Sequence, residues 1–270
     1  MGLVRRALAA VTILPLIGCF QSSTVIRVKA DGSGTIEQRT LITDAALDQL
    51  RAFAILGGGT ADTVDPTSEA QARSMAASIG PGVTYLSSTP VRTDKAQGRE
   101  ATYAFSDITQ LRINEQPPVP GGVSLRSQGV STDSEPITFA LMRQPDGNVL
   151  LRIRVPRPGV LPIATPGTNG DVMPPSIEQI DMVKQLLAGA RLTVAVEPEG
   201  RLVQTSSPFV DGNRVTLIDL DIDKAASDPD LVKKLQSPRT IDEVKAAVNS
   251  VPGFKITLDP EISITFTPAK

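Results

Sequence analysis

The stretch 24-TVIRVKADGSGTIEQRTLI-42 predicts two β-strands joined by a tight turn. Strand-forming residues stand on both sides of Asp31-Gly32-Ser33-Gly34, and glycines in a short turn between two such runs are typical of a hairpin. Thr43 then occupies the position of a helix N-cap ahead of the amphipathic run 44–56, which the glycines at 57–59 end. The domain is therefore expected to open with strand, strand and helix.

The rest of the chain repeats this mixture of paired strands and capped helices. Further strands are expected over 83–92, 99–105, 136–143, 148–156, 191–197, 201–206, 213–222 and 253–268. Further helices are expected from about Ser68 to Ile79 and after N-caps at Ser176, Asp228 and Thr240. Because the strands come in adjacent pairs with helices in runs between them, the sequence predicts an α+β fold. Its sheets are expected to be largely antiparallel, built from hairpins, with helices packed on one face.

The first eighteen residues have the layout of a secretory signal peptide. Arg5 and Arg6 precede an apolar stretch of twelve residues that ends at Gly18, whereas a helix needs about 20 residues to cross a hydrocarbon core. A charged start, a short apolar middle and a small residue before the cut are typical of export signals. Residues 1–18 are therefore expected to be removed.

Cys19 is the only cysteine of the chain, and it follows Leu16-Ile17-Gly18 directly. These four residues resemble the lipobox of bacterial lipoproteins. The resemblance implies a diacylglyceryl group on the sulfur of Cys19, cleavage between Gly18 and Cys19, and often acylation, for example with palmitate, of the new amino group. Two other interpretations fit less well: the apolar run is too short for a membrane anchor, and it lacks the spaced arginines of a mitochondrial presequence.

Residues 19–23 are expected to form a lipidated tether. One acyl chain holds a protein only marginally, but two or three hold it durably. Phe20 to Ser23 precede the first expected strand residue, and at about 3.5 Å per residue they reach no more than roughly 20 Å. By the same resemblance, Asp after the cysteine favours the inner membrane. Since Phe20 stands there, the periplasmic side of the outer membrane is expected if the organism has two membranes.

The remaining chain is long enough for one large domain or two small ones, since 270 residues less these 18 leave 252. The Pro/Gly-rich loop 156–175 is the expected seam between an N-terminal α+β portion, 24–155, and a C-terminal α+β portion, 176–270. A second Pro/Gly-rich stretch covers 114–122. The two portions are also compatible with a single domain.

The amino-acid composition makes several classes of partner and of functional site unexpected. Loss of Arg5 and Arg6 leaves 25 basic against 29 acidic residues, a net charge of −4, without any run of Lys or Arg. Nucleic acid is therefore not an expected partner, nor is electrostatic adhesion to anionic lipid. The chain has no His and no Trp, and its two tyrosines are Tyr85 and Tyr103. The commonest general base and metal ligand are thus missing, and we expect no cofactor and no aromatic platform for sugars.

Asp219, Asp221 and Asp223 have the alternating spacing that opens a calcium loop. The sixth position of such a loop is glycine and the twelfth is glutamate, but here they are Lys224 and Asp230. We expect instead a strand whose three aspartates face water. Phosphate-binding Gly-Lys, Gly-x-Ser-x-Gly and Ser-x-x-Lys motifs do not occur in the chain. No catalytic and no metal-ligating residue is therefore predicted.

Two passages, 28–50 and 194–221, resemble mycobacterial LppM-type lipoproteins. The shared patterns are a strand, DGSG, strand and helix start, and a strand pair with P-x-G and GN-x-V. The resemblance covers about fifty residues and implies an envelope protein whose folded domain contacts lipids. The pattern has an aromatic residue in its last strand, where Leu217 or Ile218 stands here, and no binding residue is carried over.

Together these features predict a non-catalytic, lipid-anchored envelope protein that binds an apolar, lipid-like partner or a protein near the membrane. Two alternatives stay open. One is a structural subunit of an envelope assembly that presents the loops 114–122 and 156–175; the other is an envelope hydrolase with paired carboxylates. A cavity of about 300 Å³ or more favours ligand binding over assembly. Two carboxylates roughly 5 to 10 Å apart in a cleft favour the hydrolase.

Overall fold

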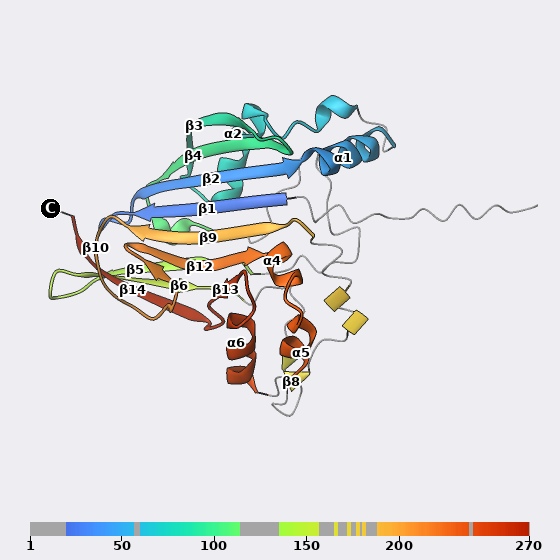
Figure 1. Cartoon of the computed structure of the whole chain (residues 1–270). Coiled ribbons are helices and arrows are strands. Elements are labelled where there is room, and N and C mark those ends of the chain that lie inside the picture. The colour runs from blue at the N-terminus through green and yellow to red at the C-terminus, as the bar shows by residue number, and fades with distance from the viewer. Residues whose placement is uncertain are drawn as a thin grey trace, which may run out of the picture.

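A computed structural model describes most of the chain beyond the predicted signal peptide. The described residues are 20–56, 60–113, 135–156, 165–166, 172–173, 177–178, 180–181, 188–237 and 240–269. The expected cap at Ser176, the helix stop at 57–59, the loop 114–122 and most of the loop 156–175 lie outside these residues. The elements within them form two main sheets and a set of short helices (Figure 1).

An eight-stranded sheet forms the centre of the fold. Its strands are β1 (Phe20–Val28), β2 (Gly34–Thr43), β3 (Thr84–Arg92), β4 (Ala96–Phe105), β9 (Arg191–Pro198), β11 (Val210–Asp211), β12 (Arg214–Asp221) and β13 (Phe254–Ile256). The order is β11-β12-β9-β1-β2-β4-β3, and β13 pairs with β12 off this path. Among the described strand pairs, β1 and β9 run parallel and the others run antiparallel. The predicted hairpins 24–42 and 83–105 are confirmed.

A four-stranded antiparallel sheet packs into the same core. It contains β5 (Thr138–Arg143), β6 (Val149–Arg154), β10 (Gly200–Thr205) and β14 (Glu261–Pro268), in the order β10-β14-β6-β5. The two-residue strands β7 (Thr165–Pro166) and β8 (Val172–Met173) pair with each other. Ile262, Ile264 and Phe266 alternate along β14 and are fully buried. This alternation confirms the burial pattern that the sequence predicts for the last strand.

Side chains supply the first hydrogen bonds of several helices. The helices are α1 (Asp44–Leu56), α2 (Glu69–Ile79), α4 (Ile222–Ala226), α5 (Leu231–Gln236), α6 (Ile241–Asn249) and the 3₁₀ turns η2 (Ala61–Thr63) and η3 (Ile108–Gln110). The hydroxyls of Thr43 and Ser68 accept bonds from N–H groups in the first turns of α1 and α2. Thr240 and Glu243 form both hydrogen bonds of the predicted capping box. The predicted caps Thr43, Ser68 and Thr240 are therefore confirmed.

One face of the large sheet, here called the inner face, carries the main core. Ile26 of β1 is aligned with Ile36 of β2 and Val196 of β9, and Tyr103 of β4 continues the row. Each of these side chains is at most 1% exposed. α2 and the four-stranded sheet add their apolar side chains to the same cluster. The inner face therefore shares one core with α2, with the short C-terminal helices and with the second sheet, which confirms the α+β class.

Two predicted boundaries in the last third differ from the structure. The strand expected over 213–222 ends at Asp221, because the carboxylate of Asp221 caps α4 by accepting the N–H of Lys224. The helix expected after Asp228 begins at Leu231. The carboxylate of Asp228 accepts bonds from the next turn and from the ammonium of Lys234, 2.7 Å away, and these hold a turn ahead of the helix.

Candidate functional site

The start of β1 is where the described structure meets the predicted anchor. Gly18 and Cys19 lie outside the described residues, so their predicted cleavage and lipidation stay predictions. β1 begins at Phe20, one residue after the cysteine. The tether predicted over residues 19–23 is therefore shorter than expected, because residues 20–23 belong to the strand.

The first residues of β1 are held from both sides. Phe20 is aligned with Ile42 of β2, and Gln21 is aligned with Arg191 of β9. The next two residues, Ser22 and Ser23, are polar. Ser22 is nevertheless buried, because it faces the core between two neighbouring strands. One of these strands, β9, lies 170 residues away in the sequence, so local patterns do not reveal the burial of Ser22.

Phe20 also packs its side chain into a second, smaller apolar cluster. The buried members of this cluster come from β2, α1 and the segment after η2; they are Ile42, Ala46, Leu47, Leu50 and Val64. Phe20 and Ala54 pack against them as partly buried residues. The cluster joins the start of β1 to the base of α1, so the first described residue is fixed by packing as well as by the sheet.

The start of β1 defines one end of the large sheet, which we call the anchor end. The register places five strand or helix termini there: the end of β2, the start of α1, the start of β4, the end of β3 and the start of β9. Figure 1 shows α1 leaving the sheet at this end. Within the described residues, no helix combines the length and apolarity needed to span a bilayer.

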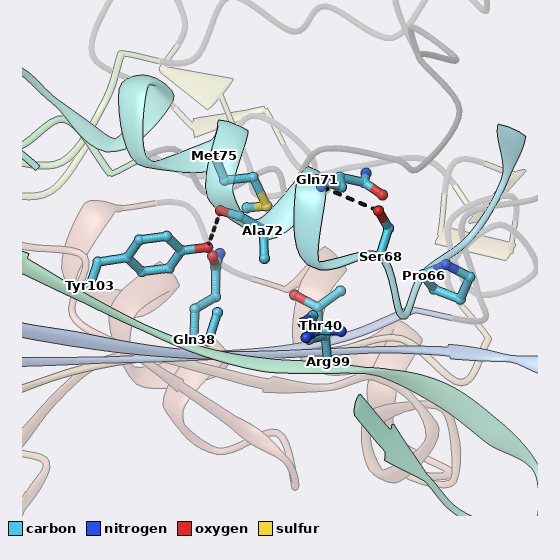
Figure 2. Close-up of a pocket in the computed structure, with 10 residues that line it drawn as sticks. Gln38, Thr40, Pro66, Ser68, Gln71, Ala72, Met75, Arg99 and Tyr103 are labelled. Atoms are coloured by element: carbon cyan, nitrogen blue, oxygen red, sulfur yellow. Dashed lines mark hydrogen bonds between the residues drawn. The ribbon is translucent and has the colours of Figure 1, made fainter. Parts of the chain in front are cut away.

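A small cavity lies between α2 and the strands β2 and β4 (Figure 2). Gln38 and Thr40 line it from β2, Gln71 from α2, and Arg99 and Tyr103 from β4. Its volume is about 40 Å³. A water molecule needs at least roughly 10–15 Å³ of such space, whereas ligand pockets measure about 300–1,000 Å³. This cavity is the size of a few water molecules and is too small for a lipid.

Arg99 is committed to structural hydrogen bonds. Its side chain is 11% exposed, and it donates to the carbonyl of Thr67 and to the carbonyl of Ser88, the latter at 3.2 Å. It also donates to the hydroxyl of Ser88 and lies 3.8 Å from a carboxylate oxygen of Glu69. The guanidinium therefore ties β4 to β3 and to the turn before α2, and its donors are not directed at a ligand.

Tyr103 closes the other end of the cavity. Its hydroxyl donates to the carbonyl of Ala72 at 2.9 Å, and its ring meets the ring of Tyr85 edge-on at a centroid distance of 6.1 Å. Burial raises the pKa of Tyr103 to about 12, although the nearby charge of Arg99 acts in the opposite direction. The phenol is therefore neutral at physiological pH and serves as a hydrogen-bond donor that pins α2 to the sheet.

The raised pKa of Tyr103 predicts a loss of stability in alkali. The unfolded phenol ionises near pH 10 but the folded one near 12, so the unfolded state loses its proton first and becomes more favoured as pH rises. Between these values the free energy of unfolding should fall by on the order of 2 kcal/mol from this group. Urea unfolding at pH 8 and pH 11 measures part of this fall, about 1.4 kcal/mol, and Tyr103→Phe should reduce it. Equal falls in both proteins would contradict the assignment.

The three aspartates with the calcium-loop spacing accept hydrogen bonds from different groups; they are Asp219, Asp221 and Asp223. Thr193 donates to Asp219 at 3.0 Å across the β9–β12 pair, and the N–H of Gly189 donates to Asp223 at 2.7 Å. Asp221 caps α4. Asp223 lies in that helix, so the prediction that all three aspartates stand on one strand is wrong. No group of three or more His, Cys, Asp or Glu side chains in the described segments is arranged to hold a metal ion.

The charged side chains of a cluster on the face opposite the core are also paired with one another. Arg27 of β1 donates to Glu37 of β2 and to Glu197 of β9, the latter at 3.0 Å. Arg214 of β12 binds the second oxygen of Glu197 at 2.8 Å. The hydrogen bond from Arg27 to Glu37 raises the pKa of the guanidinium. Two positive and two negative charges neutralise one another here, so the cluster links four strands and presents no net charge to a partner.

Comparisons with known proteins add one similar structure. No family model matches the chain, and no curated protein matches it. The NMR structure of the folded domain of LppM from Mycobacterium tuberculosis is similar, with a TM-score of 0.32 and 10% sequence identity over 94% of this chain and 92% of that one. The LppM resemblance seen in the sequence thus recurs in the structural comparison. A similarity of this size carries no argument about function.

Proposed function

We propose that the chain is a non-catalytic, lipid-anchored protein of the bacterial cell envelope. The observation that carries the proposal is the start of β1 at Phe20. The lipobox predicts that the mature chain begins at Cys19, and the fold begins one residue later. A signal peptide, a lipidated first residue and a domain that starts at once are mutually consistent, and Phe20 after the cysteine favours the periplasmic side of an outer membrane.

The proposed partner is a protein or an apolar molecule that docks on the surface of the domain near the membrane. The described cavity of about 40 Å³ gives no room for a lipid. Two of its polar lining groups, Arg99 and Tyr103, are engaged with the protein's own backbone. Docking on an external surface therefore agrees better with the geometry than enclosure of a ligand in this cavity.

Metabolic labelling tests the anchor. Cells that express the wild-type chain or Cys19→Ala are grown with a palmitate analogue and then fractionated into soluble and membrane material. We expect label and membrane association in the wild type, and the loss of both in the variant, because the acyl chains supply the binding energy. A circular dichroism spectrum of the variant domain controls for folding. Label retained on Cys19→Ala refutes the proposal.

A second candidate function is that of a structural subunit in an envelope assembly. The water-sized cavity between α2 and the strands is compatible with it, since a subunit of an assembly acts through its surface and needs no ligand-sized pocket. Cross-linking in intact cells, followed by gel filtration of the detergent extract, distinguishes the two functions. A stable species much larger than the 28.5 kDa chain supports the assembly role, whereas a monomer speaks against it.

A further inference from the structure

The last turn of α1 is uncharged and carries an exposed aliphatic side chain. Charged side chains of α1 stand in its first part, at Asp44, Asp48 and Arg51, whereas residues 52–56, Ala-Phe-Ala-Ile-Leu, carry no charge. Ile55 is 57% exposed. A large aliphatic side chain at this exposure on an uncharged helix end is a candidate contact with another apolar phase.

The position of α1 relates this turn to the anchor. The helix starts at Asp44, two residues beyond Ile42, which is aligned with Phe20, so it starts about 8 Å from the beginning of β1. At 1.5 Å per residue its thirteen residues extend about 20 Å. Figure 1 shows that α1 projects beyond the end of the sheet, on the side where β1 begins.

Covalent geometry places the predicted lipid at the same end. Cys19 precedes Phe20, and consecutive Cα atoms are about 3.8 Å apart. Phe20 is fixed by β2 and by the cluster under α1. Since a lipid on Cys19 would be one residue from the sheet, the helix that projects past this point is brought to the bilayer surface.

We propose that the last turn of α1, centred on Ile55, inserts into the interface of the bilayer that holds the N-terminal acyl chains. This inference rests on the proposed lipid anchor and adds a second, protein-borne contact that fixes which end of the domain faces the membrane. An apolar helix end buried about 5–10 Å into the boundary between headgroups and acyl chains is an established way of binding membranes. The other parts of the large sheet then point away from the bilayer.

The absence of tryptophan from the chain makes the test direct, because one substitution introduces a single fluorophore. Ile55→Trp is the reporter. Leu86→Trp in β3 is the matched control, since Leu86 is 55% exposed and lies six residues, about 20 Å, from the end of β3 at Arg92. Both variants are produced as full lipidated proteins and reconstituted into phosphatidylcholine vesicles with brominated acyl chains.

We expect the brominated lipid to quench most of the indole fluorescence of the Ile55→Trp protein and to leave that of the Leu86→Trp protein unchanged, with aqueous acrylamide giving the reverse order. If the protein floats with the vesicles but acrylamide alone quenches the Ile55→Trp reporter, the helix end is in water and this inference fails while the anchor stands. If neither reagent quenches that reporter, protein covers the turn and the inference also fails. If neither variant floats with the vesicles, the anchor itself is refuted and the inference falls with it.

Discussion

Gly98→Ala is expected to cost at least about 3 kcal/mol of folding stability, at the upper end of single substitutions. Gly98 lies inside β4, between Leu41 of β2 and Val91 of β3. A Cβ atom on it would stand 1.9 Å from the carbonyl oxygen of Thr40 and 2.8 Å from the carbonyl carbon. Both obstacles are backbone atoms of a neighbouring strand, so the β2–β4 pair must separate to accept a methyl group.

Urea unfolding at neutral pH, followed by circular dichroism, measures this cost. Gly147→Ala is the control, because Gly147 has a φ of +85° in the β5–β6 turn and nothing within 4 Å of the added atom. Its backbone strain alone should cost about 1–2 kcal/mol. If Gly98→Ala proves no more destabilising than this control, the two strands yield more easily than their hydrogen bonding suggests.

Phe266→Ala is expected to lower the free energy of unfolding by about 3–5 kcal/mol, the usual cost of removing a buried phenyl ring. Phe266 is 0% exposed in β14 and is aligned with Val149 of β6 and Leu202 of β10. It belongs to the cluster that also contains Ile26 and Ile36 of the large sheet. The cavity would therefore open between the two sheets and weaken both.

Calorimetry tests this coupling between the sheets. Because β1 pairs with β9 and β6 pairs with β14, strands from both the N-terminal and the C-terminal portion meet in each sheet. We expect one unfolding transition that moves as a whole to lower temperature in Phe266→Ala. Phe209→Ala, at a partly buried position, should move it less. Two transitions, only one of them shifted, would show that the portions unfold independently.

The parts of the fold that depend on neighbouring residues could be predicted from the sequence. The turn at 31–34, the caps Thr43, Ser68 and Thr240, and the alternation in β14 are confirmed because each is decided within a few residues. The antiparallel pairing of adjacent strands follows from the same short-range logic.

The parts of the fold that depend on distant residues could not be predicted from the sequence. The parallel pairing of β1 with β9 joins residues 170 positions apart and includes Gln21, Ser22 and Ser23. Likewise, the sequence predicts Asp228 as the N-cap of a helix. Its carboxylate instead accepts bonds from the next turn and from Lys234, and α5 begins later, at Leu231.

Of the candidate site, the sequence predicts only the lipid attachment at Cys19. Cys19 stays a prediction made from four residues of sequence. The exposure of Ile55 could not be read from α1, because Leu47 and Leu50 of the same helix are core. The water-sized cavity beside Arg99 arises from the spacing between α2 and two strands, which has no signature in the sequence.

The central place of β1 also decides how the domain carries force. A pull on its first residue acts along the strand, parallel to its length, while β2 and β9 hold it from either side. Both ladders of hydrogen bonds are then loaded in shear and must yield together, whereas a strand at a sheet margin peels away one bond at a time. A pull through the proposed lipid on Cys19 would thus load both ladders at once.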